Sequence, residues 1–149
     1  MAHDDHVRCL EQGRDVWNET RPDAADLSGL DLSDLDLSGF DLRAVDLLGS
    51  DLSRSDLTGA SLAGARLDQA TLIDAVLHDA DLTGAWMQHV VAVDADLTHA
   101  VLEGVTATGA DFSGADLRHA NLKRLDASYI TFERANLSRA RMFGADLSY

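Results

Sequence analysis

Residues 80–84 read Ala-Asp-Leu-Thr-Gly, and residues 115–119 repeat that order as Ala-Asp-Leu-Arg-His. The same five-residue unit runs from residue 25 to residue 149 without an insertion or a deletion. We call the large apolar residue of each unit its centre. There are twenty-five centres, from Leu27 to Leu147, and eighteen of them are Leu. The residue two before the centre is Ala in fifteen units, and the residue just before it is Asp in thirteen. A repeat this regular has to be read as the structural unit of the fold.

The period excludes the two common backbone forms. Five residues turn an α-helix by roughly 500°, so successive centres would form no apolar stripe. A flat strand fails as well, because the step of three residues to the next apolar pair would reverse the face. The chain must therefore bend once per unit. Ten of the eleven glycines occupy the second position after a centre, where positive φ is tolerated. The pattern predicts an all-β solenoid.

The size of one coil is indicated by the irregular residues, which recur twenty positions apart. The pairs are Phe112 and Phe132, Ala107 and Ala127, Tyr129 and Tyr149, and His99 and His119. This spacing favours four units per coil, although the period itself leaves the number open. Each centre reduced to Ala follows a larger residue two positions before it, as Val90 precedes Ala92. Such compensation is typical of a closely packed interior.

Tandem A(D/N)LXX units resemble the pentapeptide-repeat family over residues 25–149. The resemblance implies a right-handed quadrilateral β-helix of about six coils, in which the centre and the residue two before it point inward. It also implies a bacterial protein without catalytic activity.

The first 24 residues lie outside the repeat and are expected to close its open end, which every solenoid must protect. Residues 4–19 are predicted to form a short capping helix, with Val7, Leu10 and Trp17 on its apolar stripe. Pro22 ends the helix. The first coils carry large inward residues where later ones use Ala, and these are expected to receive the helix: Leu30, Leu35, Phe40 and Val45.

The C-terminal end shows no comparable cap in the sequence. Aromatic residues gather there instead, namely Tyr129, Phe143 and Tyr149. Three interpretations remain open: a chain cut inside a longer protein, a frayed monomeric end, or a homodimer through the C-terminal coils. The resemblance favours the homodimer, because end-to-end dimers occur in several members of the family.

Little in the sequence could support catalysis. It contains no phosphate-binding loop, dinucleotide fingerprint, nucleophile elbow or cysteine metal cluster. Thirteen Asp residues share one repeat position, where a short acceptor can bind backbone N–H groups around the bend. On a coil of twenty residues, Asp79, His99, His119 and Arg139 would stack beside His78. A solvated polar ladder is favoured over a metal site there, and no cofactor is expected.

The net charge of −14 is unevenly spread: residues 1–60 carry −9, residues 61–110 carry −6, and residues 111–149 carry +1. Direct nucleic-acid binding is disfavoured, because affinity for nucleic acid depends on neutralising phosphates. The acidity favours either a partner with a basic surface or simple solubility. A single cysteine, Cys9, suits a reducing compartment, and neither a signal peptide nor a membrane-spanning run is apparent. A cytoplasmic location is therefore expected.

Four apolar residues occupy outward positions where Asp, Ser or Thr would be usual: Ile73, Trp86, Val91 and Val93. An exposed cluster containing Trp is typical of a binding site for a partner protein, although local irregularity would also explain it. The favoured function is thus a non-catalytic protein-binding scaffold. The alternative, implied by the resemblance, is a DNA mimic that binds DNA gyrase or topoisomerase IV and gives resistance to quinolones or toxins. The basic C-terminal coils count against the alternative, because a mimic should be acidic at the centre of its dimer.

Overall fold

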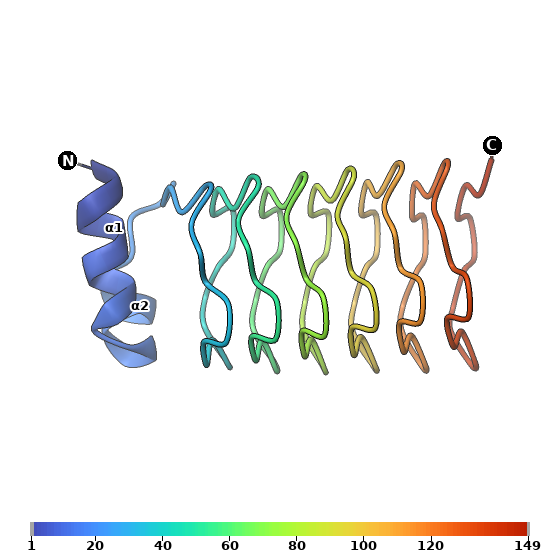
Figure 1. Cartoon of the computed structure of the whole chain (residues 1–149), viewed down its shortest axis with the longest axis horizontal. Helices are drawn as coiled ribbons and strands as arrows, with labels where there is room; N and C mark the ends of the chain where they lie inside the picture. Colours follow the sequence, from blue (N-terminus) through green and yellow to red (C-terminus); the bar gives the residue numbers. More distant parts are fainter. Residues whose placement is uncertain (1, 149) are drawn as a thin grey trace.

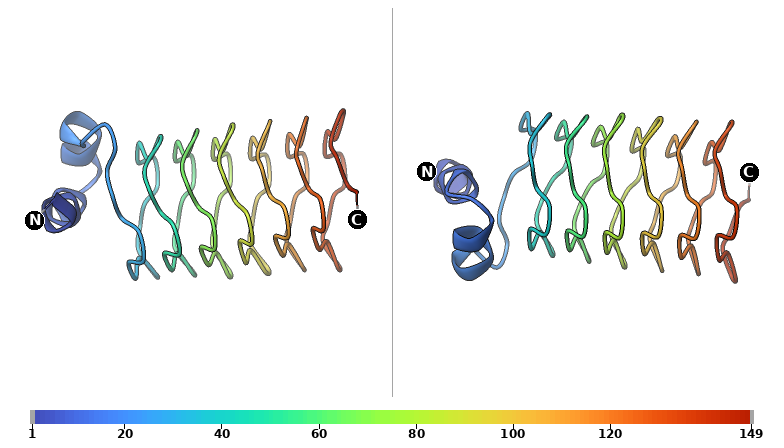
Figure 2. Two further views of the ribbon diagram at one scale, coloured as in Figure 1. Left: turned by 90° about the horizontal axis from the view of Figure 1, so that it is seen from above. Right: turned by 90° about the horizontal axis from the view of Figure 1, so that it is seen from below.

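The computed structural model describes residues 2–148 as two short helices followed by a rod of stacked coils. The helices lie at one end of the rod and the C-terminus lies at the other (Figure 1). The two views perpendicular to Figure 1 show the coils stacked along one axis with the helices across their first end (Figure 2). Within these residues neither helix is long or apolar enough to cross a bilayer.

Single-residue parallel bridges hold the coils together. The residue before each centre, from Asp26 to Asp126, pairs with the residue twenty positions later. Twenty residues hold four units of five, so each coil has four sides. A regular pair of hydrogen bonds accompanies each bridge, as when Asp46 N–H donates to the Ala25 carbonyl at 2.9 Å and Leu27 N–H donates to the Asp46 carbonyl at 2.8 Å. The expected right-handed sense of winding stays a prediction.

A backbone turn closes every unit. Each described residue at the second position after a centre, from Gly29 to Gly144, has a positive φ between 54° and 74°. In most units the next residue donates its N–H to the carbonyl of the centre, as Ala60 does to Leu57 at 2.9 Å. A four-residue turn with positive φ at its third residue alone has the form of a type II turn.

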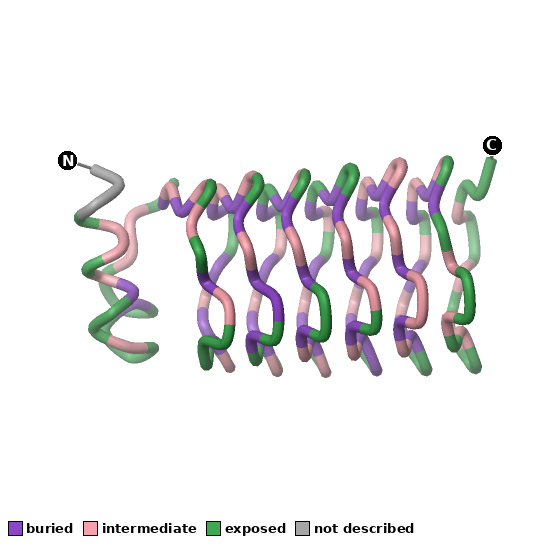
Figure 3. Tube along the Cα trace, viewed as in Figure 1, coloured by how far each residue is buried: buried purple, intermediate pink, exposed green. Residues whose placement is uncertain are grey.

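The interior is filled by the centres and the residues two before them. Nearly all of these side chains are buried from Ala25 to Ile130 (Figure 3). The predicted volume compensation is confirmed, because Val90 and Ala92 are both fully buried, as are Val105 and Ala107. Two buried serines replace Ala in the second coil, and each satisfies its hydroxyl locally: Ser50 Oγ donates to the Leu47 carbonyl at 2.8 Å.

The predicted single capping helix is wrong in one respect. Residues 4–19 do not form one helix: α1 spans Ala2–Glu11 and α2 spans Arg14–Thr20. Gly13 separates them with φ 92°, a conformation that side-chain-bearing residues rarely adopt. The break lets α2 turn back across the first coil while α1 packs beside it (Figure 2).

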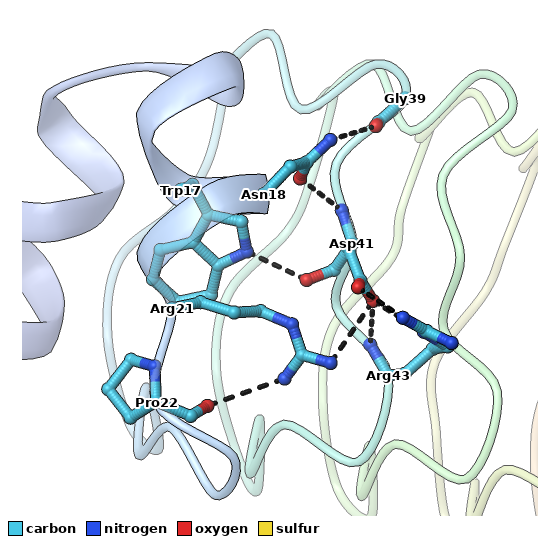
Figure 4. A network of polar contacts seen from close by, with 7 residues as sticks. All are labelled: Trp17, Asn18, Arg21, Pro22, Gly39, Asp41 and Arg43. Atoms are coloured by element: carbon cyan, nitrogen blue, oxygen red, sulfur yellow. Dashed lines mark hydrogen bonds and ion pairs between the residues drawn. The ribbon is translucent and has the colours of Figure 1, made fainter.

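Trp17 anchors this cap. Its side chain is fully buried, and its Nε1 donates to the Asp41 carbonyl at 2.7 Å (Figure 4). Leu10 is buried as well, and Val7 packs against the core partly exposed. Phe40 receives the indole, with ring centroids 6.5 Å apart. Leu35 was also expected to be covered, but it stays 41% exposed, because it lines an open groove beside Leu10 instead of packing under α2.

Candidate protein-interaction surfaces

Each bridge position repeats up the rod as a column of side chains on one side of the coil. One such column holds Trp86, and we call it the Trp86 column; from the first coil to the last it contains Asp26, Asp46, Arg66, Trp86, Thr106, Asp126 and Asp146. The next side carries Val91 in a column between Thr71 and Asp111. The outward surface of the rod is therefore a grid in which vertical neighbours are twenty residues apart.

Trp86 is the most unusual member of its column. Its side chain is 57% exposed, although indole is among the most apolar groups in the chain. A shallow groove lies beside it and is lined by Ala44, Asp46, Gly64, Arg66 and Trp86 itself. Arg66 Nη1 donates to Asp46 Oδ2 at 3.0 Å, and its Nε lies 3.8 Å from Asp68 Oδ2. The site thus presents the indole of Trp86 next to the guanidinium of Arg66, which the carboxylates of Asp46 and Asp68 hold in place.

The other three members of the predicted patch lie on the adjoining side. Ile73 is 37% exposed, whereas Val91 and Val93 are half-buried. Ile73 and Val93 belong to neighbouring coils at the same corner, where Asp74 N–H donates to the Val93 carbonyl at 3.0 Å. None of the three lines the groove beside Trp86. The structure therefore brings Ile73 together with the two valines and places Trp86 with Arg66 and Asp46, which precede it by twenty and forty residues in the same column.

The repeated Asp residues stabilise turns. All thirteen Asp residues before a centre, and both Asn residues there, accept a hydrogen bond from the backbone N–H two residues on, at 2.9–3.4 Å. Where Ser or Thr follows, its hydroxyl often donates to the same oxygen, as Thr83 does to Asp81 at 2.6 Å. The predicted structural role of this set is confirmed, since such contacts complete a bend without any ligand.

In the first coil these contacts also lower the pKa of some of the carboxylates. Hydrogen bonds from the Ser33 hydroxyl and N–H lower the pKa of Asp31, and Ser38 lowers that of Asp36 in the same way. The pKa of Asp34 is lowered by the guanidinium of Arg54, one coil away. These three carboxylates are therefore ionised at neutral pH, and of the three only Asp34 forms an ion pair among the described residues.

The histidine column adopts a definite arrangement. The rings of His99 and His119 stack with centroids 4.8 Å apart and planes 3° apart. His78 meets His99 edge-on at 5.6 Å and 79°. Within residues 2–148, no group of three or more His, Cys, Asp or Glu side chains is arranged to hold a metal ion.

The aromatic residues assigned to the C-terminal end lie on its corners. Tyr129 and Phe143 are 66% and 84% exposed, and Tyr149 lies outside the described residues. Phe143 lines a groove with Glu103, Lys123 and Arg124 on the side of the rod. The end itself is occupied by partly exposed core residues that sequence reasoning did not single out: Phe132, Leu137, Met142 and Leu147.

Comparison with known proteins agrees with this geometry. The family model described as pentapeptide repeats matches residues 23–59, 50–88 and 92–124. The chain belongs to the pentapeptide-repeat family. A pentapeptide repeat protein of the Arabidopsis thaliana thylakoid lumen is 35% identical, with a TM-score of 0.66 over 68% of this chain and 70% of that one. Solved members of the family form right-handed quadrilateral β-helices and are generally non-enzymatic scaffolds.

Two more distant solved structures also match the chain. HetL from the cyanobacterium Nostoc sp. strain PCC 7120, a pentapeptide repeat protein involved in regulation of heterocyst differentiation, is 22% identical over 99% of this chain and 97% of that one, with a TM-score of 0.35. QnrB1, a plasmid-mediated fluoroquinolone resistance protein, is 21% identical over 83% of this chain and 77% of that one, with a TM-score of 0.36. No curated protein matches the sequence.

Proposed function

We propose that this pentapeptide repeat protein is a cytoplasmic, non-catalytic scaffold that binds a partner protein through the groove beside Trp86. The observation that supports it is the 57% exposure of an indole next to the Arg66–Asp46 ion pair. Tryptophan and arginine are the residue types most enriched among energetically dominant interface contacts. Because Trp86 and Arg66 lie on a rod with a packed interior, binding of a partner does not require a loop to become ordered, and that entropy cost is avoided.

The charge of the surface defines the partner further. Residues 1–60 carry −9, and the Trp86 column begins with Asp26 and Asp46. A partner with an apolar pocket for the indole, bordered by Lys or Arg facing the N-terminal coils, would complement both features. Electrostatic attraction of this kind accelerates association more than it strengthens the final complex. Binding should therefore weaken with rising ionic strength, mainly through a slower association rate.

The test is affinity capture with the purified protein, followed by a measured affinity for the partner recovered. Trp86→Ala should lower that affinity at least about thirtyfold, the loss of a dominant interface residue. Tyr129→Ala is the matched control, because it removes another exposed aromatic two coils away and should leave binding unchanged. Equal affinity of wild type and Trp86→Ala, with both proteins folded by circular dichroism, would exclude the groove.

A DNA mimic that binds a type II topoisomerase is the second candidate. The acidic coils up to residue 110 favour it, because they present carboxylates at regular intervals along a rod. A gyrase supercoiling assay with and without a fluoroquinolone tests this directly. Asp74→Asn and Asp94→Asn remove exposed charges at turn positions that Asn also tolerates, so inhibition should fall in these variants while the fold persists. If the wild-type protein has no effect on gyrase, the protein-binding scaffold remains as the single candidate function.

A further inference from the structure

We propose that His99 and His119 together form a binding site for a first-row transition-metal ion. Both residues are exposed and occupy the same turn position in consecutive coils, with φ 62° in each. Among the described residues, neither imidazole has a hydrogen-bonding or ionic partner; their only defined contacts are with neighbouring rings. Neutral imidazole is a common ligand for Zn²⁺, Ni²⁺ and Cu²⁺.

The two rings must turn before they can share an ion. Their planes are parallel within 3° and their centroids are 4.8 Å apart, whereas nitrogen lone pairs lie in the ring planes and so do not point to a common position. A tetrahedral Zn²⁺ with Zn–N bonds of about 2.05 Å needs its two nitrogens about 3.4 Å apart and both lone pairs directed at the ion. Rotation about χ2, a torsion with broad preferences in His, can bring one nitrogen of each exposed ring into the space between the two coils. Water would supply the remaining ligands at this exposed position.

His78 supports the pair without being a ligand. Its Nδ1 lies 2.7 Å from Thr98 Oγ1 and its Nε2 lies 3.2 Å from Asp79 Oδ2, so both nitrogens are engaged. Its ring lies nearly perpendicular to that of His99, with centroids 5.6 Å apart. Asp79 adds a carboxylate on the N-terminal side of the pair, which favours a cation there.

Two cations border the site on its other side. Arg118 is neutralised by Asp116, with Nη2 and Oδ2 2.7 Å apart. Arg139 follows His119 in the same column, is exposed, and forms no ion pair with a carboxylate among residues 2–148. Its charge opposes metal binding, so Arg139→Ser should strengthen affinity by a factor of about two after screening by salt.

The experiment is calorimetric titration of the full chain with ZnCl₂ at pH 7.5. His99→Gln and His119→Gln should each weaken this site at least about tenfold, because one imidazole remains in each. Each single variant should keep a stoichiometry of one ion at this site with lower affinity, and the double variant should bind none there, which is the signature of a shared ion.

His89→Gln is the matched control. His89 occupies the same turn position with φ 56°, but its imidazole lies over Gly109 and not over a second histidine. This variant should bind Zn²⁺ as tightly as wild type. Single variants that bind Zn²⁺ like wild type would overturn the proposal. It would also be overturned if each single variant bound one Zn²⁺ ion fewer, because each histidine would then bind an ion of its own. Circular dichroism distinguishes either result from loss of the fold.

Discussion

At the scale of single residues, the turn position decides how much strain the rod contains. Every described residue two after a centre adopts a left-handed backbone conformation, yet only ten of these residues are glycine. For each of the others this conformation costs about 1–2 kcal/mol relative to an ordinary one. The bridges on both sides of the turn compensate, because every such residue except those of the last coil donates its N–H to the following coil, as Ala44 does to Ala63. Backbone pairing therefore overrides local preference.

A reciprocal pair of substitutions tests this strain. Ala44→Gly should raise the free energy of unfolding by about 1 kcal/mol, and Gly59→Ala should lower it by about the same amount. A Cβ at Gly59 would meet no heavy atom within 4 Å, so its cost comes from the backbone alone. Urea unfolding monitored by circular dichroism measures both effects. If both variants changed the free energy of unfolding in the same direction, one of the two residues would not have the positive φ described here.

The repeated Asp also acts at this scale, through its oxygen and not its charge. Asp81 accepts hydrogen bonds from the Thr83 N–H at 3.0 Å and from its hydroxyl at 2.6 Å. Asp81→Asn keeps an acceptor and should change stability by less than about 0.5 kcal/mol, whereas Asp81→Ala should cost about 1 kcal/mol. Thermal unfolding of the two variants side by side gives the comparison. A larger loss in the Asn variant would mean that charge matters more than the turn.

At the scale of elements, α2 is joined to the first coil mainly through one residue. Asp41 accepts from Trp17 on its carbonyl, donates its N–H to Asn18 Oδ1 at 2.7 Å, and holds Arg21 through its carboxylate at 3.2 Å (Figure 4). Asn18 Nδ2 also donates to the Gly39 carbonyl at 3.1 Å. Polar contacts from α2 thus converge on a single bend of the first coil, while Phe40 provides the apolar contact. α1 adds a second contact, because the Asp26 N–H donates to His6 Nδ1 at 2.9 Å, so the cap is held at two places on the first coil.

Acid should loosen this junction. Hydrogen bonds from Arg43, reinforced by Arg21 and opposed by partial burial, hold the pKa of Asp41 well below its ordinary value of 3.8. The folded state therefore binds this proton more weakly than the unfolded chain. The stabilisation is complete above about pH 5 and is lost as the pH falls through and below 3.8. Asp41→Asn should flatten the decline in stability between pH 5 and pH 3, measured by urea unfolding at each pH.

The neighbouring carboxylates provide the control for that experiment. The pKa of Asp31 is also lowered, but by Ser33 and without a contact to the cap. Asp31→Asn should therefore reduce acid sensitivity while leaving Trp17 fluorescence unchanged. Asp41→Asn should alter both. An unchanged pH profile in Asp41→Asn would mean that the ion pairs of Asp41 do not stabilise the fold.

At the scale of the whole molecule, the two ends of the rod differ. The first coil is covered by α2, whereas the last described coil leaves core positions partly exposed, with Leu147 at 47%. Interior coils bury the same position completely, as Leu47 and Leu67 show.

The family resemblance predicts a homodimer through the C-terminal coils. Light scattering after gel filtration should report a dimer for the wild-type protein. Leu147→Asp should yield a monomer, because it places a charge on the uncovered end. Phe143→Ser should remain dimeric if only the end face is used, because Phe143 lies on a lateral corner. A monomeric wild-type protein across the accessible concentration range would contradict this prediction.

The sequence by itself determined which residues face inward and where the chain bends, since a period of five allows one regular solution. It also determined the role of the repeated Asp, because that hydrogen bond spans only two residues. Local contacts of this kind are encoded in adjacent positions. The family resemblance predicted the four-sided coil, and the spacing of Phe112 and Phe132 agreed with it.

Only the tertiary structure decided what happens across coils and at the cap. It divided residues 4–19 at Gly13, placed Trp17 on Asp41, and separated Trp86 from Ile73 by giving it Arg66 and Asp46 as neighbours. It also stacked His99 on His119, and among the described residues it gave these two rings no hydrogen-bonding partner. These outcomes depend on the rotamers of side chains that contact one another in space, many of them twenty positions apart in the sequence. A one-dimensional period places such residues in the same column, but it does not specify the direction in which each side chain leans.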